Sequence, residues 1–181
     1  VQRAVAGCDI VFHLAAVARV SHAESDPTRT FDVNVEGTFN VVAAARTAGV
    51  RRVVHASSRE VYGDAARLPV CESFPIRPKN VYGLSKIASE YVARMNSGGL
   101  EVCIVRLANV YGSGDHGRVI PLFIGKALRN EPLRVYGGGQ ILDFIAIQDV
   151  AKLLHRAALV PAFDQPVNIG TGMGTRIIDL A

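Results

Sequence analysis

Short apolar runs alternate with helical patterns along most of this chain, and that alternation restricts its fold more than any other feature. The runs at 9–16, 51–58 and 101–110 are apolar enough to predict strands buried on both faces. Apolar residues at helical spacing predict helices at 27–48, 81–96, 119–130 and 149–159. The alternation favours an α/β fold with a doubly wound parallel sheet, in which ligands bind at the carboxyl ends of the strands.

The ends of the first long helix are marked by local signals, and three shorter strands are expected later in the chain. Asp26 is a plausible N-cap, Pro27 suits the first helical turn, and Gly49 suits the C-terminal cap. The later strands are predicted at 133–136, 143–147 and 166–170.

Composition excludes several classes of protein. Of 181 residues, 49% are hydrophobic and 20% charged, which indicates a folded domain and no membrane span. The net charge is +4, but the basic residues are scattered, so a nucleic-acid partner is not expected. Cys8, Cys71 and Cys103 are far apart and fit no metal site. They are expected to be buried in a reducing compartment, and the protein is expected to be cytoplasmic.

The stretch "NVYGLSK" places Tyr82 and Lys86 four residues apart, on one face of the helix expected at 81–96. A free tyrosine titrates near pH 10, but an adjacent ammonium favours the phenolate. Such a tyrosine can take or give a proton on a substrate hydroxyl. The alternative is a half-buried tyrosine beside a solvated lysine.

Two serines close the second predicted strand. Ser57 and Ser58 stand where a parallel sheet presents its ligand-binding groups. A hydroxyl there can bond the same substrate oxygen that Tyr82 deprotonates. The alternative is a pair of serines that simply opens a loop.

Seven motifs together carry a family resemblance: "HLAA", "NVEGT", "SSREVYG", "YGLSK", "RLANVYG", "DFIAIQDVA" and "NIGTG". In this order they resemble the extended short-chain dehydrogenase/reductase family, and within it the NAD-dependent nucleotide-sugar epimerase/dehydratase group. The match runs from about Cys8 to Gly172. It implies a Rossmann-type sheet, with residues 1–115 as the remainder of an NAD-binding domain that carries the catalytic residues. Residues 116–181 would be a substrate-binding region mixed with late elements of that domain.

The resemblance also implies roles for single residues. Tyr82 would be the general acid/base, Lys86 would hold the nicotinamide ribose and lower the tyrosine pKa, and Ser58 would be the hydroxyl partner. Contacts to NAD are implied for these residues: His13, Leu14, Ala15, Ala16, Asn34, Ala56, Ser57, Tyr82 and Lys86. Asn34 would brace the neighbouring strand ends, and His13 is given no proton chemistry. Substrate contacts are implied for Ser58, Asn109 and Arg118.

An epimerase is the activity that the resemblance favours, with hydride removed from and returned to the 4-position of a nucleotide sugar. Sugar dehydratases have an acid where this chain has Arg59, which disfavours dehydration. Glu60 leaves a nucleotide-sugar decarboxylase open, and both charges could instead be loop charges that face water. A non-catalytic sensor or scaffold on the same fold is a further alternative. The nucleotide, the sugar and the choice of NAD over NADP stay open.

Departures from the family pattern suggest a piece of a longer protein. The glycine-rich first βαβ unit, which would hold the pyrophosphate, is not found in the 181 residues. We therefore expect the strand at 9–14 to be an exposed apolar edge, and the piece to be inactive alone and to bind NAD weakly by calorimetry. Many members have Arg where Leu142 stands, and Arg118 is a candidate to compensate. The helices at 27–48 and 81–96 resemble those of a four-helix dimer contact, so a homodimer is expected.

Overall fold

The structure is a computed structural model that describes residues 1–65, 67–161 and 164–181. Its strands are β1 (Ile10–His13), β2 (Arg52–Ser58), β3 (Glu101–Leu107), β4 (Asn109–Tyr111), β5 (Ile141–Ala146), β6 (Val167–Ile169) and β7 (Gly174–Arg176). Its helices are α1 (Gln2–Val5), α2 (Val20–Ser25), α3 (Pro27–Phe31), α4 (Gly37–Thr47), α5 (Val81–Met95), α6 (Val119–Leu128), α7 (Ile147–Leu159) and α8 (Ile177–Leu180). No helix in these three ranges is long and apolar enough to cross a membrane.

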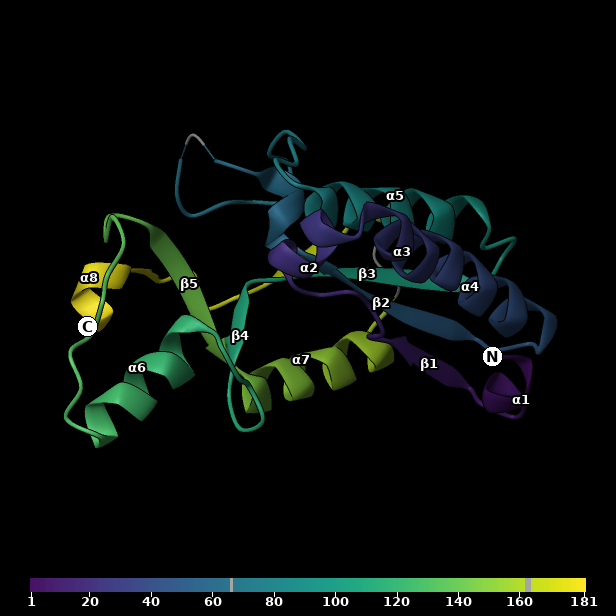
Figure 1. Ribbon diagram of the computed structural model, residues 1–181. Coiled ribbons are helices and arrows are strands. Elements are labelled where there is room, and N and C mark those ends of the chain that lie inside the picture. The colour runs from purple at the N-terminus through teal and green to yellow at the C-terminus, as the bar shows by residue number, and fades with distance from the viewer. Residues whose placement is uncertain (66, 162–163) are drawn as a thin grey trace.

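A parallel sheet of strand order β1-β2-β3-β6 forms the centre of the larger part of the chain. Helices α4 and α5 cover one face and α7 covers the other (Figure 1). Neighbouring residues of β2 point to opposite faces: Val53 packs in the core with Val42 and Ala93, and Val54 packs in the core with Val150. This arrangement confirms the predicted doubly wound parallel sheet.

Strand β1 lies at the edge of this sheet, and in the part of the chain that the structure describes it pairs with β2 alone. Phe12 in the strand is 42% exposed, and Leu14 just after it is 54% exposed. An apolar edge of this kind was expected for the strand at 9–14. Its unpaired backbone groups make it a template for pairing with another strand.

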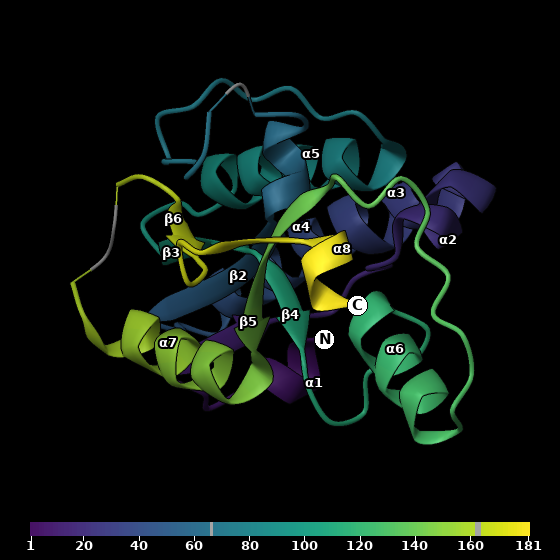
Figure 2. The same ribbon diagram turned by 90° about the vertical axis from the view of Figure 1, so that its left-hand side faces the viewer.

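The strand predicted at 101–110 is broken at Ala108, so the prediction of one continuous strand is wrong. The backbone N–H of Ala108 donates to the carbonyl of Ile169 at 2.9 Å, and the chain then leaves the first sheet. The residues that follow, Asn109–Tyr111, form β4, which pairs in parallel with β5, and β5 pairs antiparallel with β7 (Figure 2). The sequence of this run does not indicate the break, because the residues before and after Ala108 both form strands.

Two smaller expectations also differ from the structure. No strand forms at 133–136, where the apolar run is followed by Gly137 and Gly138 in the left-handed region and no partner strand pairs with it among the described residues. Cys8 and Cys71 are exposed and only Cys103 is buried. Cys8 lies in the turn before β1 and Cys71 in the loop before α5, and neither segment enters the core.

The helical segment predicted at 27–48 forms as α3, a π-helical turn (Asp32–Glu36) and α4 in succession. The carboxylate of Asp26 caps it by accepting the N–H of Arg29 at 3.0 Å, and Gly49 follows its end with a φ of +72°. These contacts confirm the cap signals. The π-helical turn carries Asn34, and such turns often occur at functional sites.

Candidate active site

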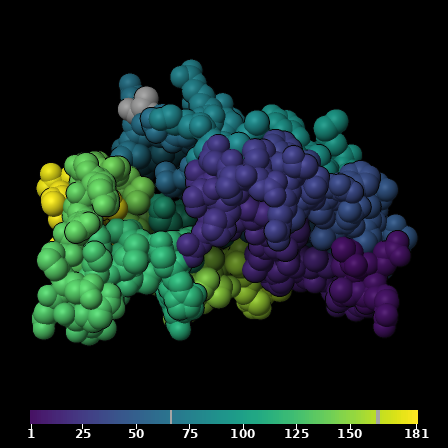
Figure 3. All heavy atoms as spheres, in the orientation of Figure 1, coloured from purple at the N-terminus to yellow at the C-terminus, as the bar shows by residue number. Residues whose placement is uncertain are grey.

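A cavity of about 640 Å³ opens at the carboxyl ends of β2 and β3 and extends to the second sheet. Figure 3 shows the face where the purple and blue N-terminal half adjoins the green segment that carries α6. The cavity is lined by most of the residues that the sequence singled out: Leu14, Ala16, Ala56, Ser57, Ser58, Tyr82, Lys86, Asn109 and Arg118. The position agrees with the rule that parallel sheets bind ligands at these strand ends.

The hydroxyl pair that the sequence predicted is assembled in this cavity. Ser58 is the last residue of β2, is 8% exposed, and accepts the backbone N–H of Glu60 at 3.2 Å. Its hydroxyl also lies close enough to the phenol of Tyr82 to act on the pKa of that group. A single substrate oxygen can therefore contact both groups.

Burial raises the pKa of Tyr82 above its ordinary value, and the nearby carboxylate of Glu60 raises it further. The hydroxyl of Ser58 and the charge of Arg118 lower this pKa, but each by less than burial raises it. The expectation of a net lowered pKa for Tyr82 is therefore wrong, whereas the effect expected from Lys86 stays a prediction. Desolvation of the phenolate outweighs the neighbouring positive charges, so Tyr82 is a neutral phenol at pH 7.

Lys86 is 3% exposed, and burial lowers its pKa to about 8. The charge of Glu90, one helical turn further along α5, raises it. His13 and His55 stack with their ring centroids 5.2 Å apart, and burial together with the charge of Lys86 lowers the pKa of both rings, that of His13 to about 4. Lys86 is therefore an ammonium at neutral pH, beside two uncharged imidazoles.

Gly83 explains how helix α5 brings Tyr82 to the end of β2. A Cβ atom on Gly83 would lie 2.6 Å from the carbonyl oxygen of Glu60, so only glycine permits this approach to the 3₁₀ turn Arg59–Tyr62. Asn80 caps the same helix: its Oδ1 accepts the N–H of Gly83 at 2.7 Å, and its Nδ2 donates to Glu60 Oε2 at 2.8 Å.

Three predicted cofactor residues do not line the cavity as the structure describes it: His13, Ala15 and Asn34. Asn34 is 1% exposed, and its side chain accepts the N–H of Val17 at 2.8 Å and donates to the hydroxyl of Ser85 at 2.9 Å. It thus braces the segment after β1 against α5. His13 Nε2 contacts Thr38 Oγ1 at 2.9 Å, inside the core.

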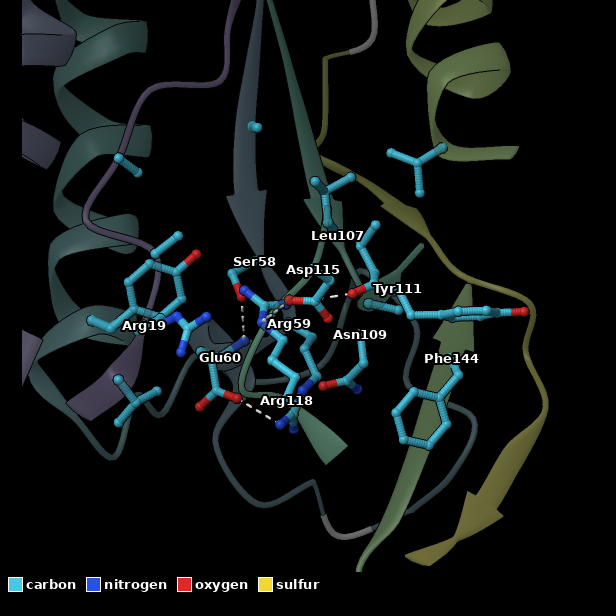
Figure 4. A pocket seen from close by; sticks show the side chains of 18 of the residues that line it. Arg19, Ser58, Arg59, Glu60, Leu107, Asn109, Tyr111, Asp115, Arg118 and Phe144 are labelled. Atoms are coloured by element: carbon cyan, nitrogen blue, oxygen red, sulfur yellow. Dashed lines mark hydrogen bonds and ion pairs between the residues drawn. The ribbon is translucent and has the colours of Figure 1, made fainter. Parts of the chain in front are cut away.

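The second sheet and the loop before α6 supply the other wall of the cavity. Asn109 donates to the carbonyl of Asp143 at 3.2 Å, and Arg118 lies 3.5 Å from Asp115 just before α6 begins. Figure 4 shows Arg118 and Asn109 on the same side of the pocket as Phe144, which belongs to β5.

Two cations in the cavity were not assigned to it from the sequence. The guanidinium of Arg19 donates to the carbonyl of His116, 97 residues away, and lies beside the same pocket (Figure 4). Arg19 lies in the segment between β1 and α2, and none of the motifs singled out in the sequence contains it. Arg59 pairs with Glu60 at 2.6 Å, and both line the cavity, which favours a role in the site over the alternative of solvated loop charges.

Comparison with known proteins gives a consistent set of similarities. The profile of the NAD dependent epimerase/dehydratase family matches residues 1–170. A UDP-glucose 4-epimerase of Mycolicibacterium smegmatis is 35% identical over 180 residues, and UDP-glucuronic acid decarboxylase 4 of Arabidopsis thaliana is 34% identical over 184 residues. The solved dTDP-glucose 4,6-dehydratase of Streptomyces venezuelae, with NAD bound, has a TM-score of 0.91 and 32% identity.

These proteins are longer than this chain. The alignments cover 95%, 96% and 99% of the chain, respectively, but 58%, 41% and 57% of the three proteins. The chain therefore spans about three fifths of the epimerase and of the dehydratase.

Proposed function

The chain belongs to the NAD-dependent epimerase/dehydratase family, a family of enzymes, and on this basis we propose that it carries the proton-transfer centre of a nucleotide-sugar 4-epimerase. The observation that carries the proposal is the meeting of Ser58, Tyr82 and Lys86 in one cavity at the strand ends. The division into a cofactor part at 1–115 and a substrate part at 116–181 is kept as a prediction.

NAD is the cofactor of this family, and the residues present fit one end of it. The buried ammonium of Lys86 is suited to the hydroxyls of the nicotinamide ribose, and the small side chains of Ala16 and Ala56 leave room for a flat ring. Leu14 and Ser57 also line the cavity. When bound, NAD would accept the hydride from the sugar and return it.

The side chains divide the remaining work between them. In its phenolate form, Tyr82 takes the proton from the sugar 4-hydroxyl when the ketone forms, and the resulting phenol gives the proton back when the alcohol is restored. Ser58 holds the same oxygen in place. Asn109, Arg118 and Arg19 are suited to the polar and anionic parts of the substrate, because all three line the cavity that holds Tyr82. Arg118 and Arg19 would supply the cations that an Arg at position 142 would have given.

A decarboxylase is the second candidate, because Glu60 is retained in the cavity and a decarboxylase is 34% identical to the chain. The carboxylate of Glu60 is engaged on both oxygens, by Arg59 at 2.6 Å and by Asn80 at 2.8 Å. With both oxygens engaged, the carboxylate is less free to turn toward a substrate, which favours the epimerase. Retention of Tyr82 and Lys86 argues against a sensor or scaffold.

Assay of the natural full-length protein with NAD separates these functions. We expect UDP-glucose or UDP-glucuronate to be converted into its 4-epimer without release of carbon dioxide. Carbon dioxide released from UDP-glucuronate would instead establish the decarboxylase. NAD binding without turnover of either sugar, or of their N-acetylated and dTDP-linked counterparts, would favour the sensor.

We propose further that the protein is a cytoplasmic homodimer joined through α4 and α5. Phe39 on α4 and Leu84, Tyr91 and Met95 on α5 are exposed apolar side chains, and the last three lie on one face of the helix. Tyr91→Arg is expected to convert the dimer into a monomer in light scattering, whereas Leu128→Arg on α6 is the matched control. A monomeric parent protein would contradict the proposal, and cell fractionation checks the location.

A further inference from the structure

A buried carboxylate outside the predicted set connects the proton-transfer centre to the core. Glu90 lies on α5, one turn beyond Lys86, and is 4% exposed. Its Oε1 accepts the hydroxyl of Ser57 at 2.5 Å and Nε of Arg106 at 2.9 Å, and its Oε2 accepts Nη2 of Arg106 at 2.7 Å. Ser57 and Arg106 are themselves 3% and 5% exposed. The carboxylate is therefore fixed by three bonds and screened from water.

Arg106, in β3, is in turn fixed on its other side. Its Nη1 donates to the hydroxyl of Tyr62 at 2.9 Å, and that hydroxyl donates to Asn168 Oδ1 at 2.7 Å. Asn168 of β6 donates to the carbonyl of Val70 at 3.0 Å, which ties the network to the loop before α5. The network thus joins strands β2, β3 and β6 to helix α5, and a rotation of Glu90 would break several bonds at once.

Titratable groups from three elements face Lys86. His13 on β1 and His55 on β2 are uncharged neighbours whose pKa values Lys86 lowers, and Glu90 on α5 is the group that raises the pKa of Lys86. Arg106 on β3 faces the far side of the carboxylate. Glu60 and Arg118 act on the phenol of Tyr82. Glu90 is thus the anion that favours the charged form of Lys86.

We propose that Glu90 is a positioning residue of the proton-transfer centre, which holds Ser57 at the end of β2 and keeps Lys86 charged. The inference rests on the proposed roles of Lys86 and Tyr82. Lys86 can favour a phenolate only as an ammonium, and the ammonium is also its stronger donor to a ribose hydroxyl. Its pKa of about 8 lies only slightly above neutral pH, so loss of the opposing charge would neutralise it under working conditions.

The test compares pH profiles of kcat/KM for the full-length protein and two variants, from about pH 6 to about pH 9.5. Activity should fall as the pH rises through the pKa of Lys86, because the ammonium is lost. Glu90→Gln keeps the size and the acceptor oxygen but removes the charge, so this fall should move to lower pH by about one unit or more. Glu90→Asp keeps the charge, so the midpoint of the alkaline fall in activity should stay within about 0.3 pH unit of that of the parent protein.

Controls separate positioning from structure. Glu131→Gln removes a charge from an exposed ion pair and should move nothing. If Glu90→Gln fails to fold because Arg106 is left unpaired, the double variant Glu90→Gln with Arg106→Gln removes both buried charges. It should show a shift in the same direction but a smaller one, because the opposing charge of Arg106 is also lost. Two results would overturn the inference. One is a folded variant without the Glu90 charge whose activity falls at the same alkaline pH as that of the parent protein. The other is an equal loss of activity at every pH in Glu90→Gln and Glu90→Asp.

NAD affinity gives a readout that does not need turnover. Calorimetry on the full-length protein should show that the affinity for NAD weakens as the pH rises. In Glu90→Gln, the same loss of NAD affinity should occur at a lower pH than in the parent protein. If no sugar is turned over but this shift is present, the proposed epimerase fails and the role of Glu90 stands. If turnover is normal and both profiles are unshifted, the proposed function stands and the role of Glu90 fails.

Discussion

Replacement of Tyr82 by Phe is expected to lower the turnover of the full-length enzyme by about 10³-fold, within the range that general acid–base catalysis supplies. The phenol is the group that Ser58 contacts inside the cavity, and Phe keeps the ring while it removes the proton. Lys86 stays in place, so NAD affinity should remain within about twofold, because its hold on the ribose does not need the phenol. Steady-state kinetics and calorimetry measure the two effects.

Tyr136→Phe is the matched control, because this tyrosine is 80% exposed and lies outside the cavity. It should leave both quantities unchanged. A Tyr82→Phe enzyme with more than about a tenth of the parent activity would show that another group moves the proton. Loss of NAD binding would point to a structural role for the phenol.

Arg106→Met is expected to destabilise the fold by about 3–5 kcal/mol, the cost of leaving a buried charge without its partner. The change removes both bonds to Glu90, at 2.9 and 2.7 Å, and the bond to Tyr62 at 2.9 Å. It also removes the guanidinium 5.0 Å from the ring centroid of Tyr62. Urea unfolding followed by circular dichroism measures the free energy of unfolding.

Two companion variants test that explanation. Arg129→Met removes an exposed partner of Glu131 and should change stability by less than about 1 kcal/mol. Arg106→Met combined with Glu90→Leu removes both buried charges and should recover most of the loss. If Arg106→Met costs less than about 1 kcal/mol, or if the double variant is no more stable than the single one, the buried pair does not act as described.

The elements with local signals could be predicted from the sequence. The cap at Asp26, the turn at Gly49 and the buried strand 52–58 all depend on residues close together in the chain, and the structure confirms them. The break at Ala108 could not be predicted, because the partner that ends the strand is the carbonyl of Ile169, and the two residues are distant in sequence. Apolar periodicity does not show which strand a residue will pair with.

Some features of the candidate site could likewise be predicted from the sequence, and others could not. Tyr82, Lys86 and Ser58 could be recognised because their spacing and strand-end position are visible in the sequence. The direction of the Tyr82 pKa could not, because it depends on how deeply the phenol is buried. Arg19 was missed because its partner, His116, comes from a loop 97 residues later. Burial and distant pairing are properties of the packed chain.

The break at Ala108 has a consequence for how such a protein can diverge. Ser58 and Tyr82 are held by the first sheet and its helices, whereas Asn109 and Arg118 come after the break. Substitutions in the second sheet and around α6 can therefore alter the shape and charge offered to a ligand while the reacting groups keep their support. A lineage could change its ligand preference through β4, α6, β5 and β7 and inherit the support of its reacting groups intact, which is a form of modularity within one continuous chain.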